Sequence, residues 1–290
     1  MKRVFTSIIA LVGLLAFSQS GGKKNAATNN PIFEGWYADP EGAVFDETFW
    51  VYPTFSDDYD KQLHFDAFSS KDLVNWEKHE RILDTTKVKW LRQALWAPSI
   101  IEKEKRYYLF FGANDIQRPG RNSYDPNNDI NHFGGIGVAV ADNPAGPFED
   151  YLGEPLISDF YNGAQPIDQF VFKDIDGTYY FMWSEGNWTN GTYKVAYAMA
   201  DKATGPYKRI GTILESKEND IATGAGHHSV VNKPGTDEWV IVYHRRPKPN
   251  EDRNHRVTCM DVMEFNIDGI IKPVKMTFTG VRSKAGNLKD

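Results

Sequence analysis

From residue 30 onwards, apolar and polar positions follow one another in short runs that are typical of β-strands. β-Branched and aromatic residues occur in brief stretches, and Gly, Pro, Asp and Asn interrupt them. No longer stretch has apolar positions at the three- and four-residue spacing of an amphipathic helix. The pattern therefore predicts an all-β protein.

One strand-turn-strand phrase recurs along this part of the chain. Its four copies span residues 44–55, 100–114, 171–187 and 230–246. An apolar strand followed by Gly-Pro and an aromatic residue comes after two of the copies, at 139–148 and 198–207. A hairpin unit that recurs roughly every 60 residues predicts a β-propeller, because a blade buries its faces only against its neighbours.

The repeat indicates about four blades between residues 31 and 290, either in a closed ring or in a five-blade ring with a gap. We expect residues 31–36 to add a strand to the C-terminal blade, since closure by both termini removes the raw edge of a propeller. A β-sandwich with similar hairpins is the alternative architecture.

The chain begins with a segment that is typical of export. Lys2 and Arg3 precede an apolar run from Val4 to Phe17, and small and polar residues follow this run. This order predicts a signal peptide over residues 1–20, with an uncleaved anchor as the alternative. Residues 21–30 are predicted to form a short tether. We therefore expect a secreted or periplasmic protein that has no membrane attachment after cleavage of the signal.

The only cysteine, Cys259, lies in an apolar stretch that reads as a strand. An exported protein of this kind must be stable without disulfides. We expect Cys259 to be a packed core thiol rather than a nucleophile.

Charge and aromatic content narrow the function classes. The chain has 39 acidic and 33 basic side chains and a net charge of -6, so it has no basic surplus to neutralise phosphates. We therefore expect no nucleic-acid partner. Aromatic residues make up 14% of the chain, which suits strands and also clefts that bind flat sugar rings.

A long polar loop at residues 118–134 contains the opening spacing of a calcium loop, at Asp125, Asn127 and Asp129. Ile130 and Ile136 stand where such a loop needs Gly and Glu, which argues against an EF-hand.

One residue with a chemically useful side chain stands in front of each repeated hairpin. These residues are Asp39, Trp96, Asp168 and His227. Equivalent positions of successive blades converge on the propeller axis, so two carboxylates, a tryptophan and a histidine are predicted to meet there. Glycoside hydrolysis needs such a set, because one carboxylate activates water, an acid protonates the leaving oxygen, and sugar faces stack on aromatic rings.

The phrases that contain these residues resemble glycoside hydrolase family 43. They are YADP at 37–40, LWAPS at 95–99, PIDQF at 166–170 and GAGHHSVV at 224–231, and the resemblance extends from about residue 31 to about residue 280. It implies a five-bladed propeller enzyme that acts by inversion on arabinose- and xylose-containing polysaccharides. It also implies that no cofactor is required.

By this resemblance, Asp39 would be the general base, and Asp168 would tune the acid and orient the sugar. The other matched positions are Phe55 and Trp96 in the sugar pocket, Arg245 at a substrate hydroxyl, and His227 at an axial histidine that holds calcium, another ion or water in many members.

The general acid departs from the family pattern. Members carry it as a Glu, usually in Glu-Gly-Pro, and this chain has no such phrase. The hairpin that follows Asp168 runs directly into the strand of residues 198–207, as though the first strand of one blade had been joined to the second strand of the next. We therefore expect about one blade, with its acid, to be absent. Glu185 is the best remaining acid, and a supporting or rim carboxylate is the alternative role for it.

The sequence thus favours an exported, monomeric inverting glycosidase for α-L-arabinofuranosyl or β-xylosyl linkages, with arabinose- or xylose-containing oligosaccharides and polysaccharides as partners. A sugar-binding propeller that has lost its acid is the alternative. An invertase-like retaining hydrolase would need an Asn-Asp-Pro-Asn nucleophile phrase and an Arg-Asp-Pro phrase, and neither is present.

Overall fold

The computed structural model describes residues 30–113, 135–157, 168–174, 176–202, 204–216, 221–249 and 252–281. Within these ranges the fold consists of antiparallel strands and two short 3-10 turns, at Tyr59–Lys61 and Thr85–Lys87. The polar loop at residues 118–134 and most of the proposed signal and tether lie outside the described residues. No helix in the described part of the chain is long and apolar enough to span a membrane.

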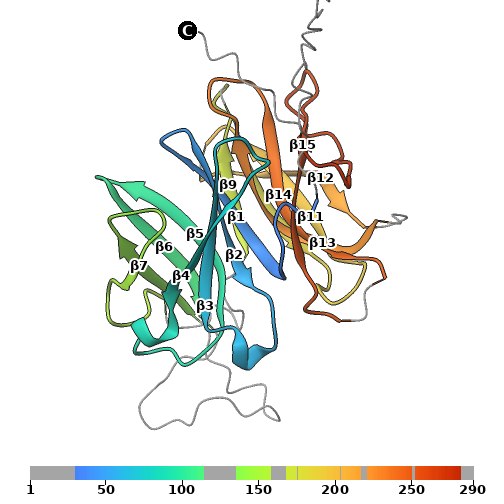
Figure 1. The fold of residues 1–290 in the computed structure, drawn as a ribbon. Coiled ribbons are helices and arrows are strands. Elements are labelled where there is room, and N and C mark those ends of the chain that lie inside the picture. The colour runs from blue at the N-terminus through green and yellow to red at the C-terminus, as the bar shows by residue number, and fades with distance from the viewer. Residues whose placement is uncertain are drawn as a thin grey trace, which may run out of the picture.

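The described strands form four sheets, which are the blades of a propeller (Figure 1). The first contains β1 (Tyr37–Phe45), β2 (Thr48–Phe55), β3 (His64–Ser70) and β4 (Glu77–Asp84). The second contains β5 (Leu95–Lys103), β6 (Arg106–Ala113), β7 (Gly135–Ala141) and β8 (Glu149–Asp150). The third contains β9 (Gln169–Lys173), β10 (Tyr179–Glu185), β11 (Lys194–Ala200) and β12 (Lys208–Glu215), and the fourth contains β13 (Ala222–Asn232), β14 (Trp239–Pro247) and β15 (Val257–Met263).

The four repeated hairpins are confirmed as β1–β2, β5–β6, β9–β10 and β13–β14, each the first pair of its blade. Two of the turns have two residues with positive φ, Asp46–Glu47 and Glu104–Lys105. This conformation matches the right-handed twist of the flanking strands, so the short polar turns set the register of both hairpins.

Hydrophobic packing joins the blades in the order second, first, fourth and third. One cluster of buried side chains is shared by the first and second sheets, and another by the third and fourth. A smaller cluster connects the first sheet to the fourth. There, Gly42 of β1 lies so close to β13 and β14 that an added Cβ would come within 2.9 Å of Val231 and 3.1 Å of Val242.

None of these clusters joins the second sheet to the third across the described residues. Among the described residues, the ring of sheets is therefore open between the second and the third sheet. The green second sheet and the orange fourth sheet lie on opposite sides of the blue first sheet in Figure 1.

The N-terminal segment lies along the last strand, as expected for ring closure. The backbone N–H groups of Ile32 and Tyr37 donate to the carbonyls of Thr258 (3.1 Å) and Arg256 (2.8 Å) at β15. The segment is irregular and not a full strand. Asn30, which the sequence placed at the end of the tether, is buried and belongs to the fold.

Cys259 is fully buried in β15 and has no disulfide. Burial raises the pKa of its thiol to about 12. Its position matches the predicted core thiol.

Candidate active site

Three of the four axial residues predicted from the repeats share one unusual backbone feature, and the residue after the fourth has it too. Asp39, Asp168 and His227 have φ values of 47°, 65° and 25°, and Ala97, which follows Trp96, has a φ of 43°. The pairing register of β1, β5 and β13 shifts at these positions, and Asp168 directly precedes β9. Left-handed backbone at a residue other than glycine costs on the order of 1–3 kcal/mol and is concentrated at functional sites. The same local bend in every blade therefore aims these side chains at the channel.

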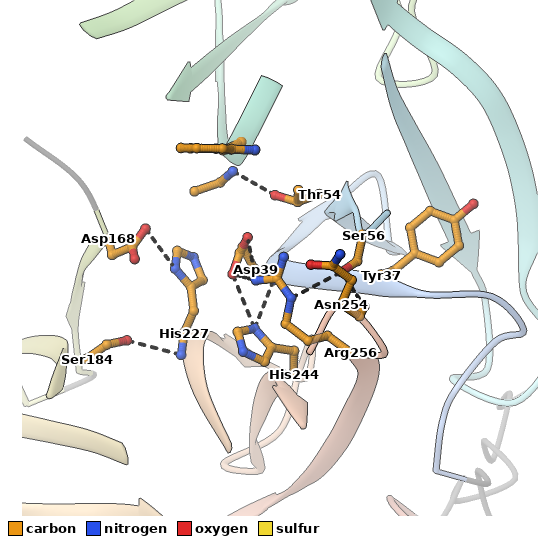
Figure 2. A network of polar contacts seen from close by, with 12 residues as sticks. Tyr37, Asp39, Thr54, Ser56, Asp168, Ser184, His227, His244, Asn254 and Arg256 are labelled. Atoms are coloured by element: carbon orange, nitrogen blue, oxygen red, sulfur yellow. Dashed lines mark hydrogen bonds and ion pairs between the residues drawn. The ribbon is translucent and has the colours of Figure 1, made fainter. Parts of the chain in front are cut away.

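A pocket of about 860 Å³ opens at this end of the channel. Its lining comprises Asp39, Asp58, Tyr59, Gln62, Trp96, Ala97, Asp168, Trp183, Ser184, Gly186, Asn187, Trp188, Tyr193, Arg253, Asn254 and Arg256. All four blades contribute to it, through their strands or the connections between them. The predicted residues Asp39, Trp96 and Asp168 thus meet in one pocket, and His227 contacts Asp168 (Figure 2).

Asp39 is buried, and a cation holds it in the ionised form. Nη1 of Arg256 lies 3.3 Å and 3.5 Å from the two carboxylate oxygens. The backbone N–H of Asp39 donates to Nδ1 of His244 at 3.1 Å. Burial alone would raise the pKa of Asp39, but Arg256 and the histidines outweigh it and hold the pKa well below its ordinary value. A carboxylate in this state can accept a proton from water.

Asp168 forms an ion pair with His227, with 3.1 Å between Oδ1 and Nδ1. The backbone N–H of His227 donates to Oγ of Ser184 at 3.1 Å. Burial would lower the pKa of His227, but the charges of Asp168 and Asp39 raise it to about 9. His227 is therefore a cation at neutral pH. Burial lowers the pKa of the neighbouring His244 to about 4, so His244 is neutral.

Aromatic side chains form the walls of the pocket. Nε1 of Trp96 donates to Oε1 of Gln62, and Tyr59 packs edge-on against Trp96. On another wall, the guanidinium groups of Arg256 and Arg253 lie 5.0 Å and 5.7 Å from the centre of the Trp188 ring. Flat rings beside hydrogen-bonding groups suit a sugar, whose C–H faces stack and whose hydroxyls bond.

Phe55 and Arg245 do not occupy the predicted positions. Phe55 is absent from the pocket lining and packs against Tyr37 and His64. Arg245 is buried, and its guanidinium donates to the carbonyl of Thr277 at 2.9 Å. Side chains alternate along a strand, so Arg245 faces away from Asp39 because its neighbour His244 faces toward it.

Glu185 is also outside the pocket. Its carboxylate pairs with Arg209 of β12 at 3.0 Å and with Lys194 of the adjacent strand β11 at 3.7 Å. The preceding residue, Ser184, faces His227, so alternation turns Glu185 to the other face of β10. The structure therefore does not place Glu185 in the pocket, where the predicted acid would have to act. Among the described residues, the carboxylates that line the pocket are Asp39, Asp168 and Asp58, and Asp58 is a rim residue paired with Lys61.

Sequence reasoning missed Arg256, Gln62 and Trp188. All three lie in connections between strands, where the repeated phrases give no register. The density of Arg, Asn and His in residues 252–256, directly before β15, was the available signal for Arg256.

A metal ion at His227 is not supported by the geometry. Nδ1 of His227 is held by Asp168, and the described residues contain no group of three His, Cys, Asp or Glu side chains placed to hold a metal.

Comparison with known proteins gives the family. The model of "Glycosyl hydrolases family 43" matches residues 28–188 and 172–271. The chain belongs to glycosyl hydrolase family 43. It is 35% identical to a β-D-galactofuranosidase of Aspergillus niger, over 90% of this chain and 88% of that protein. It is 24% identical to an arabinoxylan arabinofuranohydrolase of Bacillus subtilis, over 89% of this chain and 66% of that protein.

Solved structures of family 43 enzymes share the fold. A thermostable family-43 glycoside hydrolase superposes with a TM-score of 0.70 at 21% identity, covering 88% of this chain and 99% of that one. An α-L-arabinofuranosidase from Clostridium thermocellum superposes with a TM-score of 0.62 at 26% identity, covering 86% of this chain and 96% of that one.

The alignments also show a difference in length between this family 43 chain and its relatives. The two family matches overlap over residues 172–188. The alignment with the Aspergillus protein has 319 positions, whereas 90% of this 290-residue chain is about 261 residues. About 58 positions of the relative therefore have no counterpart here. This length is close to one blade, and the overlap lies in the third sheet, beside the open place in the ring.

Proposed function

We propose that this family 43 protein is an exported, monomeric glycosidase whose pocket binds a terminal α-L-arabinofuranosyl or β-xylosyl unit of a plant oligosaccharide or polysaccharide. The observation that carries the proposal is the meeting of Asp39 and Asp168 in an aromatic pocket, with Asp39 kept ionised by Arg256.

The chemistry follows from these charges. In a single displacement, Asp39 takes a proton from water while the water oxygen bonds to the anomeric carbon. The bond from that carbon to the leaving oxygen breaks, and the configuration inverts. Asp168, held by His227, is placed to bond the sugar hydroxyls. The leaving oxygen must gain a proton or depart as an anion.

The described pocket has no carboxylic acid placed to donate that proton. Loss of general-acid help costs about 10²–10⁴-fold, and the cost grows with the basicity of the leaving group. We therefore expect hydrolysis of activated aryl glycosides and weak turnover of natural linkages.

The relatives support a furanoside as the substrate. The named activities of two of them concern galactofuranosyl and arabinofuranosyl units. α-L-Arabinofuranose and β-D-galactofuranose share a ring configuration and differ in the group outside the ring. A β-D-galactofuranoside is therefore a third substrate to compare with the arabinoside and the xyloside.

The test is hydrolysis of the p-nitrophenyl derivatives of these three sugars by the mature chain and by Asp39→Asn. We expect release of p-nitrophenol from at least one glycoside and a loss of about 10²-fold or more in the variant. Inversion predicts that no methyl glycoside forms when methanol is added. Equal release by both proteins would refute the assignment of Asp39.

A sugar-binding protein without turnover is the second candidate, and the lack of an acid in the described pocket favours it. It predicts binding of arabinose- or xylose-containing oligosaccharides by calorimetry, with no hydrolysis of aryl glycosides above the Asp39→Asn background. Export is tested separately by sequencing the N-terminus of the mature protein, which should begin near residue 21.

A further inference from the structure

A second cavity, of about 100 Å³, adjoins the sugar pocket. The two share Ala97 and Asp168, and the smaller one is also lined by Glu41, Ser99, His227 and His228. Its volume is enough for about three water molecules. The proposed mechanism assigns no role to Glu41 or His228.

His228 lines this cavity with ring nitrogens that lack hydrogen-bond partners among the described residues. The residue is only 4% exposed. Burial, together with the charge of His227, lowers its pKa to about 3, so the ring is neutral. A neutral imidazole offers one donor and one acceptor. Buried groups of this kind nearly always bond to water when protein gives no partner, so the cavity suits ordered water.

Glu41 is the second residue of this cavity to which the proposed mechanism assigns no role. It follows Asp39 by two residues on β1, but its carboxyl lines only the smaller cavity. Its hydrogen bond to Ser99 is a long one, in which Oγ of Ser99 donates to Oε1 of Glu41 at 3.5 Å. Burial raises the pKa of Glu41 to about 8, although His227 and Ser99 act in the opposite direction.

Glu41 is badly placed to be the missing acid. The leaving group of a terminal sugar departs through the mouth of the sugar pocket, and Glu41 does not line that pocket. It shares a cavity instead with both members of the Asp168–His227 pair. An ionised Glu41 would compete with Asp168 for the charge on His227, whereas an uncharged group of the same shape would fill the space without competing.

We propose that Glu41 is a positioning residue, whose side chain fills the cavity beside His227, keeps the His227 ring on Asp168 and thereby orients Asp168 toward the sugar. This rests on the proposed function of the site.

The test compares Glu41→Gln with Glu41→Ala. Gln keeps the shape, the hydrogen bonds and the neutrality, so kcat and KM on the aryl glycoside should stay within about threefold of those of the unmodified protein. Ala leaves room for the His227 ring to turn away, and we expect kcat to fall about tenfold or more while KM changes little. Glu47→Gln, a substitution at an exposed residue of the turn between β1 and β2, is the matched control. A Gln variant as impaired as the Ala variant would overturn the proposal, because it would mean that the charge of Glu41 is needed.

A second readout does not depend on turnover. The ring nitrogens of His227 give NMR signals that are identified by their loss in His227→Gln. We expect the signals of a doubly protonated ring bonded to a carboxylate in the unmodified protein and in Glu41→Gln, and a changed pattern in Glu41→Ala. If Glu41→Ala does not fold, Glu41→Ser replaces it with the same expectation, since Ser also leaves the space beside the His227 ring unfilled. Unchanged His227 signals in the folded Ala or Ser variant would refute the positioning role, even if no glycoside is hydrolysed and the proposed function has failed.

Discussion

Nη1 of Arg256 lies 3.3 Å from Oδ1 of Asp39, although 217 positions separate the two residues in the chain. Asp39 begins the first blade, and Arg256 directly precedes the last strand of the fourth blade. The contact between the two ends of the chain therefore closes the fold and also brings Asp39 and Arg256 together in the site. The backbone bond from the N–H of Tyr37 to the carbonyl of Arg256 connects the same two segments, at 2.8 Å.

Replacement of Arg256 by Gln should move the acid limb of activity to higher pH. Asp39 is ionised far into the acid range because Arg256 outweighs the effect of burial on its pKa. Without the guanidinium, burial raises the pKa, so the carboxylate takes up a proton at a higher pH and stops acting as a base. The measurement is kcat/KM on an aryl glycoside against pH. An acid limb that stays in place would show that another group keeps Asp39 ionised.

The axial set was predictable because it repeats. Asp39, Trp96, Asp168 and His227 stand at one register of the hairpin phrase, and the structure shows a matching left-handed residue at or beside each of them. In a propeller, residues at equivalent positions of successive blades lie around one axis.

The errors have two physical causes. Arg245 and Glu185 are each one position away from a residue that faces the site, and alternation on a strand turns such a pair to opposite faces. Arg256 and Trp188 come from connections without a repeat, where the sequence offers no register. The missing blade, by contrast, was indicated by the sequence at the hairpin that follows Asp168, where the first strand of one blade runs directly into the second strand of the next.

Asn30→Ala should destabilise the fold without touching the pocket. The side chain of Asn30 donates to the carbonyl of Met260 at 2.9 Å and accepts from its N–H at 2.8 Å. Truncation leaves these buried groups without partners, which costs about 2–3 kcal/mol. Urea unfolding measures the loss. Asn143→Ala, which removes one bond in an exposed turn, is the control and should cost much less. Equal losses in the two variants would mean that the N-terminal segment does not close the ring.

The substitution His227→Gln should lower the free energy of unfolding more at acidic pH than at alkaline pH. The pKa of His227 is raised to about 9 in the folded protein, against about 6.5 in the unfolded chain. Protonated His227 therefore stabilises the folded state. This contribution is complete below the pKa of the unfolded chain and is lost as the pH rises through about 9. His228 and His244 titrate below this window, because their pKa values are lowered to about 3 and about 4. Urea unfolding at about pH 6 and about pH 10 measures the two losses. A loss that is equal at both pH values would show that the charge on His227 contributes nothing.

Glu185→Gln separates the structural position of this residue from a catalytic one. Its carboxylate is partly exposed and bonds to Arg209 and Lys194, so the substitution removes a surface ion pair that is worth about 0–1 kcal/mol. We expect kcat on a p-nitrophenyl arabinoside to be unchanged, and any slow release of arabinose from an alkyl arabinoside to be unchanged as well. A true general acid behaves differently, because its loss slows the alkyl substrate far more than the aryl one. Asp39→Asn, which removes the base, should slow both substrates. Selective loss of the alkyl activity in Glu185→Gln would mean that Glu185 reaches the leaving oxygen when sugar is bound.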